Sequence, residues 1–156
     1  MPSAIEERLI ARSGPDGFVA VVRFMEEALY APDSGYYSRV RSPLGPRGDF
    51  YTAAHVSPIY SACCAERVRR ALDALPRRGA PQIIEIGPGD GSLAVGLLHS
   101  LSVTPPTRDD WSYVLSDRSP ARMKDSAARI RESLPASMNR VRELAGGVGE
   151  VGPFAG

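Results

Sequence analysis

The chain has 156 residues, which favours a single domain, and its 19 lysines and arginines nearly balance its 18 acids. That balance gives no electrostatic case for binding nucleic acid or an anionic membrane surface. No apolar run approaches the length of a membrane span, and the first residues lack the layout of a secretory signal. We therefore expect a cytoplasmic protein.

The N-terminal part predicts two helices, over residues 5–11 and 18–29, separated by a turn rich in glycine. In the second helix, apolar residues recur at helical spacing, which indicates a face that packs in the core. A loop rich in proline and glycine follows over residues 42–49. Residues 48–53 then combine an acid, two aromatic rings and a hydroxyl without periodicity. Functional residues concentrate on such loops, although an ordinary loop with a turn at Asp49 fits equally well.

A third helix is predicted to begin at Ser57 and Pro58, because serine is a favoured N-cap and proline is favoured in the first turn. The arginines along this helix are interrupted by acids, so we interpret them as solvated charge rather than a nucleic-acid surface. Cys63 and Cys64 are neighbours on this helix, where their side chains diverge. We interpret them as small apolar residues, and we predict no metal site.

Residues 82–93 predict a strand, a glycine turn and the start of a helix. Isoleucines at 83, 84 and 86 suit a buried parallel strand, over residues 82–86. Gly87, Gly89 and Gly91 permit a sharp turn and the close approach of a ligand to the backbone. A helix over residues 93–101 follows. Together these elements predict a small-molecule cradle at the carboxyl end of a sheet.

The ligand of this cradle is indicated by Glu85 and by the glycine spacing, which is G-x-G-x-G rather than the dinucleotide pattern G-x-G-x-x-G. An acid two residues before the first glycine would repel a pyrophosphate and suits a cationic group. S-adenosylmethionine carries an amino group, a sulfonium and a nucleoside, so we interpret the turn as a methyl-donor site. A plain glycine turn is the alternative, and an NAD-dependent oxidoreductase is disfavoured. The cofactor-binding residues of the turn would be Glu85, Gly87, Pro88, Gly89, Asp90 and Gly91.

A second strand is predicted over residues 111–116, followed by a helix from Ser119 and Pro120 to about residue 134. This order implies parallel strands with right-handed crossovers. Asp117 would lie just beyond the second strand, beside the glycine turn, where an acid can bind the ribose hydroxyls. An acid that only caps the helix or closes a turn is the alternative. A third short strand is predicted over residues 139–144, before a glycine-rich tail.

Taken in order, these motifs resemble a family of SAM-dependent methyltransferases, the one that includes the mitochondrial complex I assembly methyltransferase and its bacterial relatives. The motifs that carry the resemblance are residues 24–30 (FMEEALY), Pro32 with Gly35-Tyr36-Tyr37, Gly48-Asp49-Phe50 with Thr52, Ser57-Pro58, residues 85–91, and Asp117 with Ser119. The resemblance implies an α/β fold, a Rossmann-like class I methyltransferase sheet preceded by an N-terminal helical segment. It also implies that Asp49 and Thr52 lie on a loop over S-adenosyl-L-methionine, that Ser119 joins the cofactor-binding residues, and that the acceptor is a protein arginine.

The chain departs from the family pattern at three places. Asp117 stands where the family usually has glutamate, and His55 stands where many members have proline or glutamate. The family's later Asn-Glu-x-x-Asp-Ala-x-Pro segment is not found, so the resemblance covers its N-terminal part and no catalytic residue is predicted. The alternative is therefore a truncated SAM-binding or assembly-partner module without turnover.

This resemblance predicts N-terminal helices and a cofactor-covering loop over residues 1–56, the first half of a Rossmann-like core over 57–144, and a tail over 145–156. Because the sheet would be incomplete, we expect Tyr113, Leu115 and Val141 to lie near an uncovered edge that favours self-association.

Overall fold

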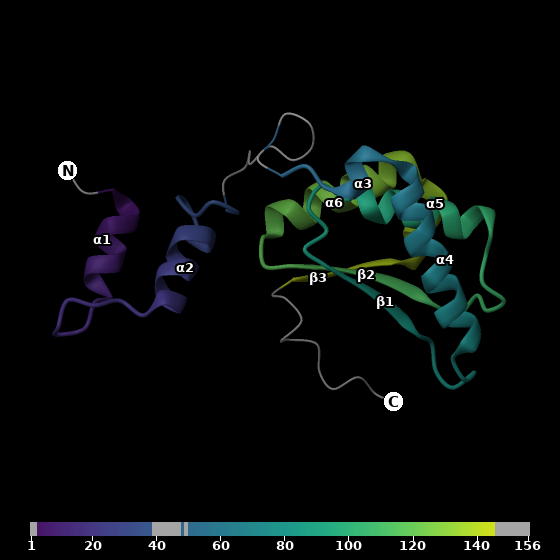
Figure 1. The fold of residues 1–156 in the computed structure, drawn as a ribbon, viewed down its shortest axis with the longest axis horizontal. Helices are drawn as coiled ribbons and strands as arrows, with labels where there is room; N and C mark the ends of the chain where they lie inside the picture. Colours follow the sequence, from purple (N-terminus) through teal and green to yellow (C-terminus); the bar gives the residue numbers. More distant parts are fainter. Residues whose placement is uncertain (1–2, 39–47, 49, 146–156) are drawn as a thin grey trace. The chain divides into compact units, whose positions relative to one another are not determined.

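A computed structural model of the chain describes residues 3–38, 48 and 50–145. The chain forms two compact units, residues 1–42 and 43–156. In chain order the elements are α1 (Ala4–Ala11), α2 (Val21–Tyr30), α3 (Ala53–Val56), α4 (Pro58–Ala74), β1 (Gln82–Ile86), α5 (Ser92–Val103), β2 (Ser112–Asp117), α6 (Pro120–Ser133), the 3-10 helix η1 (Pro135–Arg140) and β3 (Val141–Ala145) (Figure 1). Among the described residues, no helix is both long and apolar enough to cross a bilayer.

The N-terminal unit pairs α1 with α2 through a buried acid. Glu27 of α2 is buried, and its carboxylate lies 3.1 Å from Arg12 and 3.9 Å from Arg8 of α1. After α2 the chain folds back on the helix end, where Tyr36 N–H donates to the carbonyl of Ala28. A Cβ at Gly35 would lie 2.4 Å from the backbone nitrogen of Ala31, so this return requires glycine.

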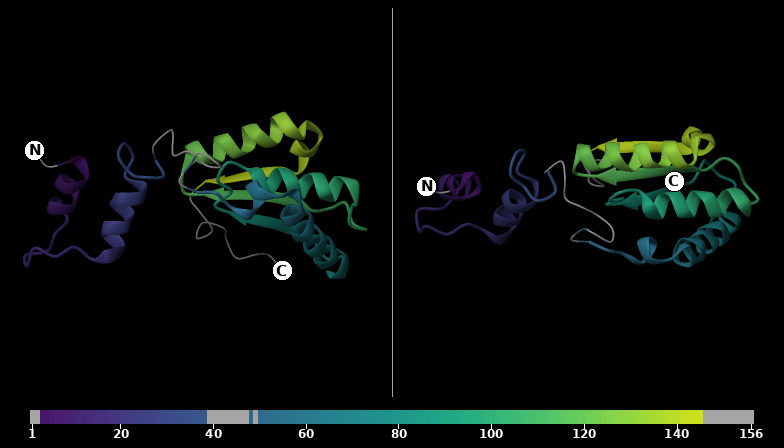
Figure 2. Two further views of the ribbon diagram at one scale, coloured as in Figure 1. Left: turned by 45° about the horizontal axis from the view of Figure 1, so that its top comes forward. Right: turned by 90° about the horizontal axis from the view of Figure 1, so that it is seen from above.

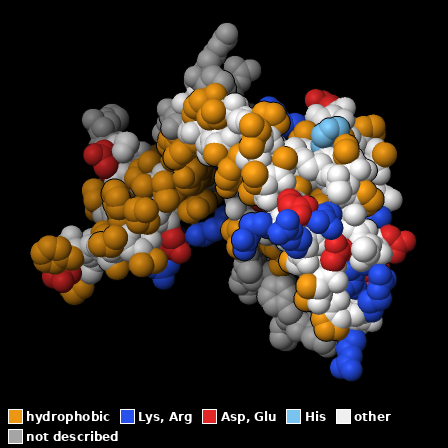
Figure 3. All heavy atoms as spheres, turned by 45° about the vertical axis from the view of Figure 1, so that its right-hand side comes forward, with side chains coloured by type: hydrophobic (Ala, Val, Ile, Leu, Met, Phe, Trp, Pro, Cys, Tyr) orange, Lys and Arg blue, Asp and Glu red, His pale blue; other side chains and the backbone are white. Residues whose placement is uncertain are grey.

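The apolar face predicted for the second helix is not buried. Val21 is 75% exposed, and Phe24 and Met25 are 49% and 46% exposed. Figure 3 shows apolar side chains gathered on this unit. The expectation of a core face was wrong because the contact between α1 and α2 is made around Glu27, an acid, rather than around these side chains.

The C-terminal unit is built on a parallel sheet in the order β1-β2-β3. Residues Ile83, Tyr113 and Val141 are register partners and point to the same face of the sheet, where they join the core. The helices α4, α5 and α6 cover this face (Figures 1 and 2). Because β2 lies between β1 and β3, its residues are the most deeply buried of the sheet.

The predicted elements of this unit match the structure closely, with three corrections. The predicted third strand begins at Val141, because residues 139 and 140 belong to the unpredicted 3-10 helix η1. The predicted third helix, begun by Ser57 as N-cap, is preceded by the unpredicted single turn α3. The uncovered edge does not include Tyr113 and Leu115, which are 1% and 0% exposed, because β2 is the central strand. The described sheet has three strands, as expected of an incomplete one, and β1 and β3 form its edges.

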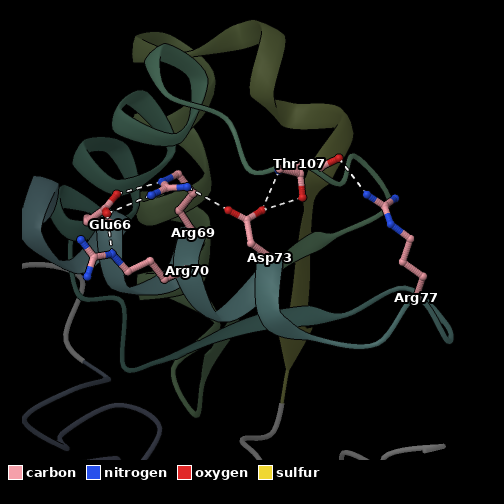
Figure 4. Close-up of polar contacts among 6 residues, drawn as sticks. All are labelled: Glu66, Arg69, Arg70, Asp73, Arg77 and Thr107. Carbon is pink, nitrogen blue, oxygen red and sulfur yellow. Dashed lines mark hydrogen bonds and ion pairs between the residues drawn. The ribbon is translucent and has the colours of Figure 1, made fainter.

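Most charged residues of α4 are paired with one another and with the loop before β2 (Figure 4). Arg69 lies 2.8 Å from both Glu66 and Asp73, and Arg70 lies 2.6 Å from Glu66. Asp73 also accepts hydrogen bonds from the backbone N–H and the hydroxyl of Thr107. Internal pairing therefore accounts for most of this charge and also fastens the proline-rich loop to α4.

Helices α4 and α5 approach each other closely at Gly96. A Cβ at Gly96 of α5 would lie 2.5 Å from the Cβ of Ser61 on α4, and Ser61 is 2% exposed. A Cβ is fixed to its backbone, so neither helix could relieve this overlap by rotating a side chain. The helices can approach this closely only because residue 96 has no side chain.

We expect Gly96→Ala to lower the free energy of unfolding, because overpacking costs about 1–3 kcal/mol and the better helix propensity of alanine returns only about 1 kcal/mol. Urea unfolding followed by circular dichroism measures the change. Adding Ser61→Gly removes the opposing Cβ and should restore most of the loss. A single variant as stable as the parent would show that the two helices can move apart freely.

Candidate functional site

The glycine turn between β1 and α5 has the backbone that the sequence predicts. Gly87, Gly89 and Gly91 have φ angles of +69°, +60° and +80°, a region that other residues adopt only with strain. Gly87 N–H donates to the carbonyl of Ser116 at 2.7 Å and so joins the turn to β2. Gly91 is the residue before α5, so the free N–H groups of the helix begin at the turn.

Helix α6 packs against the glycine turn. Ser126 is fully buried, and its hydroxyl donates to the carbonyl of Gly89 at 2.8 Å. A Cβ at Gly91 would lie 3.0 Å from the backbone oxygen of Ser126. Glycine is therefore required at position 91 both for its φ angle and for the approach of α6.

Asp90 connects the turn to three other segments. Its Oδ1 accepts a hydrogen bond from the N–H of Ser92 and lies 3.1 Å from Nε2 of His55, while its Oδ2 lies 3.0 Å from Arg129 of α6. Burial alone would raise the pKa of Asp90, but the hydrogen bonds from Ser92 and the charge of Arg129 outweigh it and place the pKa below the usual value. Asp90 is therefore an ionised anchor.

The loop that precedes α4 reaches this anchor through His55. The N–H of Thr52 donates to Nδ1 of His55 at 3.2 Å, and the Thr52 hydroxyl lies 3.0 Å from the same nitrogen. The structure thus brings Thr52 and Asp90, two predicted site residues, to opposite sides of one imidazole. Asp49, predicted on the same loop, lies outside the described residues.

Glu85 lies one residue before the end of β1, and its Oε2 accepts a hydrogen bond from the hydroxyl of Tyr113 at 2.8 Å. Burial raises the pKa of Glu85 to about 7, against the effect of the Tyr113 hydrogen bond and with a smaller contribution from the charge of Asp90. Burial also raises the pKa of Tyr113, so the tyrosine stays a donor. Among the described residues, no lysine, arginine or histidine forms an ion pair with Glu85.

Asp117 is the last residue of β2 rather than the first beyond it, and it lies beside the turn because Ser116 accepts from Gly87. Its Oδ1 accepts from the N–H of Ser119 at 2.8 Å, so Asp117 does close a turn. This hydrogen bond uses one carboxylate oxygen and leaves the second for a ligand. Ser119 is the N-cap of α6, where its hydroxyl accepts from Arg122 N–H.

The three parallel strands end at the same edge of the sheet, and the predicted site residues that the structure describes collect there. The carboxylates of Glu85 and Asp117 flank a bare glycine backbone, while Asp90 faces the loop of Thr52. Sequence reasoning missed His55, Tyr113, Ser126 and Arg129, which reach the site from other elements. Only the spacing of Ser126 and Arg129 on one helix could have indicated a shared face. The arrangement can bind a small cationic ligand that carries a ribose.

Comparisons with known proteins agree with this geometry. The sequence profile of a family of S-adenosyl-L-methionine-dependent methyltransferases matches residues 63–145. The protein arginine methyltransferase NDUFAF7 of mitochondria is 32% identical in Danio rerio and 34% identical in Homo sapiens, over 64% and 57% of this chain. A crystal structure of a COG1565 superfamily member from Burkholderia thailandensis, bound to S-adenosyl-homocysteine, is 34% identical and superposes with a TM-score of 0.76 over 90% of this chain.

The matched part is a fraction of each relative. It covers 23% of the Danio rerio protein, 19% of the human protein and 36% of the Burkholderia thailandensis chain. The family profile nevertheless spans more than half of this chain, including the glycine turn, Asp117 and all three strands. The chain belongs to the S-adenosyl-L-methionine-dependent methyltransferase family.

Proposed function

We propose that this chain binds S-adenosyl-L-methionine at the glycine turn and transfers its methyl group to a protein arginine. The observation that carries the proposal is Glu85, a half-buried carboxylate beside the glycine turn whose described partner is a neutral hydroxyl. A carboxylate that is partly withdrawn from water is costly to ionise unless a cation compensates it, and the raised pKa of Glu85 reflects that cost. The amino group of S-adenosyl-L-methionine is such a cation, so the residues present fit this cofactor.

The chain's own residues would act by binding and orienting. The turn presents backbone without side chains, the second oxygen of Asp117 would accept from a ribose hydroxyl, and Glu85 would hold the amino group. The cofactor itself supplies a methyl group already activated by its sulfonium. Alignment of such a donor with its acceptor contributes much of the rate, so a strong base is not required on this part of the chain.

The arginine acceptor is inferred from the mitochondrial relatives, which are named protein arginine methyltransferases. A second candidate is a module that binds the cofactor but has no turnover by itself. The edge position of β1 favours this candidate, because Ile86 at its carboxyl end is 69% exposed beside the turn. A radiolabelled-methyl assay against a cell lysate distinguishes the two, since only the first predicts labelling by this chain alone.

Titration calorimetry should show binding of S-adenosyl-L-methionine and S-adenosyl-homocysteine, and much weaker binding of NAD. A pyrophosphate would have to approach both Glu85 and Asp90, whereas an amino group is attracted to them. Adenosine serves as a control for the nucleoside common to all three ligands. Tighter binding of NAD than of S-adenosyl-L-methionine would refute the proposal.

The ionisation of Glu85 should make stability depend on pH. Its folded pKa of about 7 lies above the ordinary value of 4.5, so the folded state binds the proton more tightly. Its contribution to the free energy of unfolding is therefore full below pH 4.5. As the pH rises towards 7 and above, this contribution is lost, by up to about 3 kcal/mol. Glu85→Gln should remove this loss.

Urea unfolding of the parent and of Glu85→Gln between pH 4.5 and 8 measures the effect, because the difference between them cancels other titrating groups. The free energy of unfolding of the variant should increase relative to that of the parent as the pH rises. Saturating S-adenosyl-L-methionine should shrink that gain, because its amino group would stabilise the ionised carboxylate. A difference that is constant with pH would place Glu85 in contact with solvent.

Asp117→Ala should weaken binding of S-adenosyl-L-methionine by about 1–3 kcal/mol, because the ribose loses a charged acceptor. Asp117→Asn is the matched control for the turn, since its amide oxygen can still accept from Ser119 N–H. Both variants should bind more weakly in calorimetry. If Asp117→Asn binds as tightly as the parent, the acid serves only the turn.

A further inference from the structure

One imidazole joins two segments that lie 35 residues apart. His55 places Nε2 at 3.1 Å from Oδ1 of Asp90 on the glycine turn, and Nδ1 at 3.2 Å and 3.0 Å from the backbone nitrogen and hydroxyl of Thr52. The side chain of His55 is only 12% exposed. Both ring nitrogens are therefore engaged, one by each segment.

The protonation state of the ring follows from its partners. A backbone N–H can only donate, so Nδ1 of His55 must be the acceptor for Thr52. The single ring proton then belongs on Nε2, where it is donated to the carboxylate of Asp90. In this neutral tautomer the imidazole cannot leave either partner without breaking a hydrogen bond.

The two ends of this link differ in how firmly they are held. Asp90 is fixed independently by Ser92 and Arg129. The segment 50–56 exposes much of its apolar surface: Tyr51 and Val56 are 53% and 63% exposed, and the helix in this segment is a single turn. Segments with little buried apolar surface open easily, so hydrogen bonds decide their position.

We propose that His55 is a positioning residue that fastens the segment 50–56 to the glycine turn and thereby sets the affinity for the cofactor. This inference rests on the proposed function, because it assumes that S-adenosyl-L-methionine binds at the turn. His55 need not touch the cofactor. It holds Thr52 and the backbone around it against a turn whose own geometry is fixed by glycine and by α6.

Two isosteric variants separate the two hydrogen bonds. Asparagine places an amide oxygen near the position of Nδ1, so His55→Asn can keep the contact with Thr52. Glutamine places its amide nitrogen near the position of Nε2, so His55→Gln can keep the contact with Asp90. His55→Ala removes both. His99→Ala is the control, because His99 is an exposed histidine on α5.

Hydrogen exchange by NMR and calorimetry with S-adenosyl-homocysteine are measured on the same proteins. The amide of Thr52 should exchange faster in His55→Ala and His55→Gln but stay protected in His55→Asn. Affinity should fall about tenfold or more in His55→Ala, the size expected for hydrogen bonds to a charged group, and recover in part in both isosteres. His99→Ala should match the parent in both measurements.

Three outcomes would overturn the inference. Equal protection of the Thr52 amide in His55→Ala and the parent would show that the link does not hold the segment. A lower urea midpoint with unchanged affinity would make His55 a stabilising residue only. No binding by the parent itself would reject the proposed function, and the exchange of Thr52 would still report separately whether the link exists.

Discussion

The hydrogen bond from Gly87 to Ser116 is the contact on which the geometry of the site depends. It continues the pairing of β1 with β2 by one residue into the turn, at 2.7 Å, where the chain has already left the strand. Because Asp117 follows Ser116 directly, the same bond sets the position of that carboxylate relative to the glycine backbone. A ligand that contacts both therefore meets two segments whose separation is determined by strand pairing.

The sequence predicted the parts of this arrangement that depend on local chemistry. The isoleucines of β1 and the three glycines dictate a strand and a turn with left-handed backbone, and Ser57 and Ser119 cap helices as their residue type favours. The ends of β1 were predicted correctly, whereas those of β2 and β3 differed by one or two residues, because the propensity of a terminal residue is weak compared with the register of its neighbours. For this reason Asp117 was predicted to follow the strand, whereas it is the last residue of β2.

The parts that could not be predicted depend on contacts between distant segments. The hydroxyl of Tyr113 reaches Glu85 only because β2 lies beside β1, and Ser126 reaches Gly89 only because α6 crosses behind the turn. Pattern alone also could not show that the apolar side of α2 is exposed, since helical spacing marks a face without saying what covers it. His55 is the clearest case: nothing in its neighbours along the chain indicates Asp90.

Because β1 lies at the edge of the described sheet, the pairing of a further strand with β1 and the binding of a ligand at the glycine turn involve the same segment. β1 carries Glu85 and leads directly into the glycine turn, and among the described strands none pairs with its outer side. A polypeptide strand that paired with the outer side of β1 would fix the backbone of β1 and of the turn that follows it. A ligand of the turn would bind that same backbone in its ordered form. By thermodynamic reciprocity, such a strand and such a ligand would each strengthen the binding of the other by the same factor. Strand pairing at this edge and ligand binding at the turn would then be thermodynamically coupled.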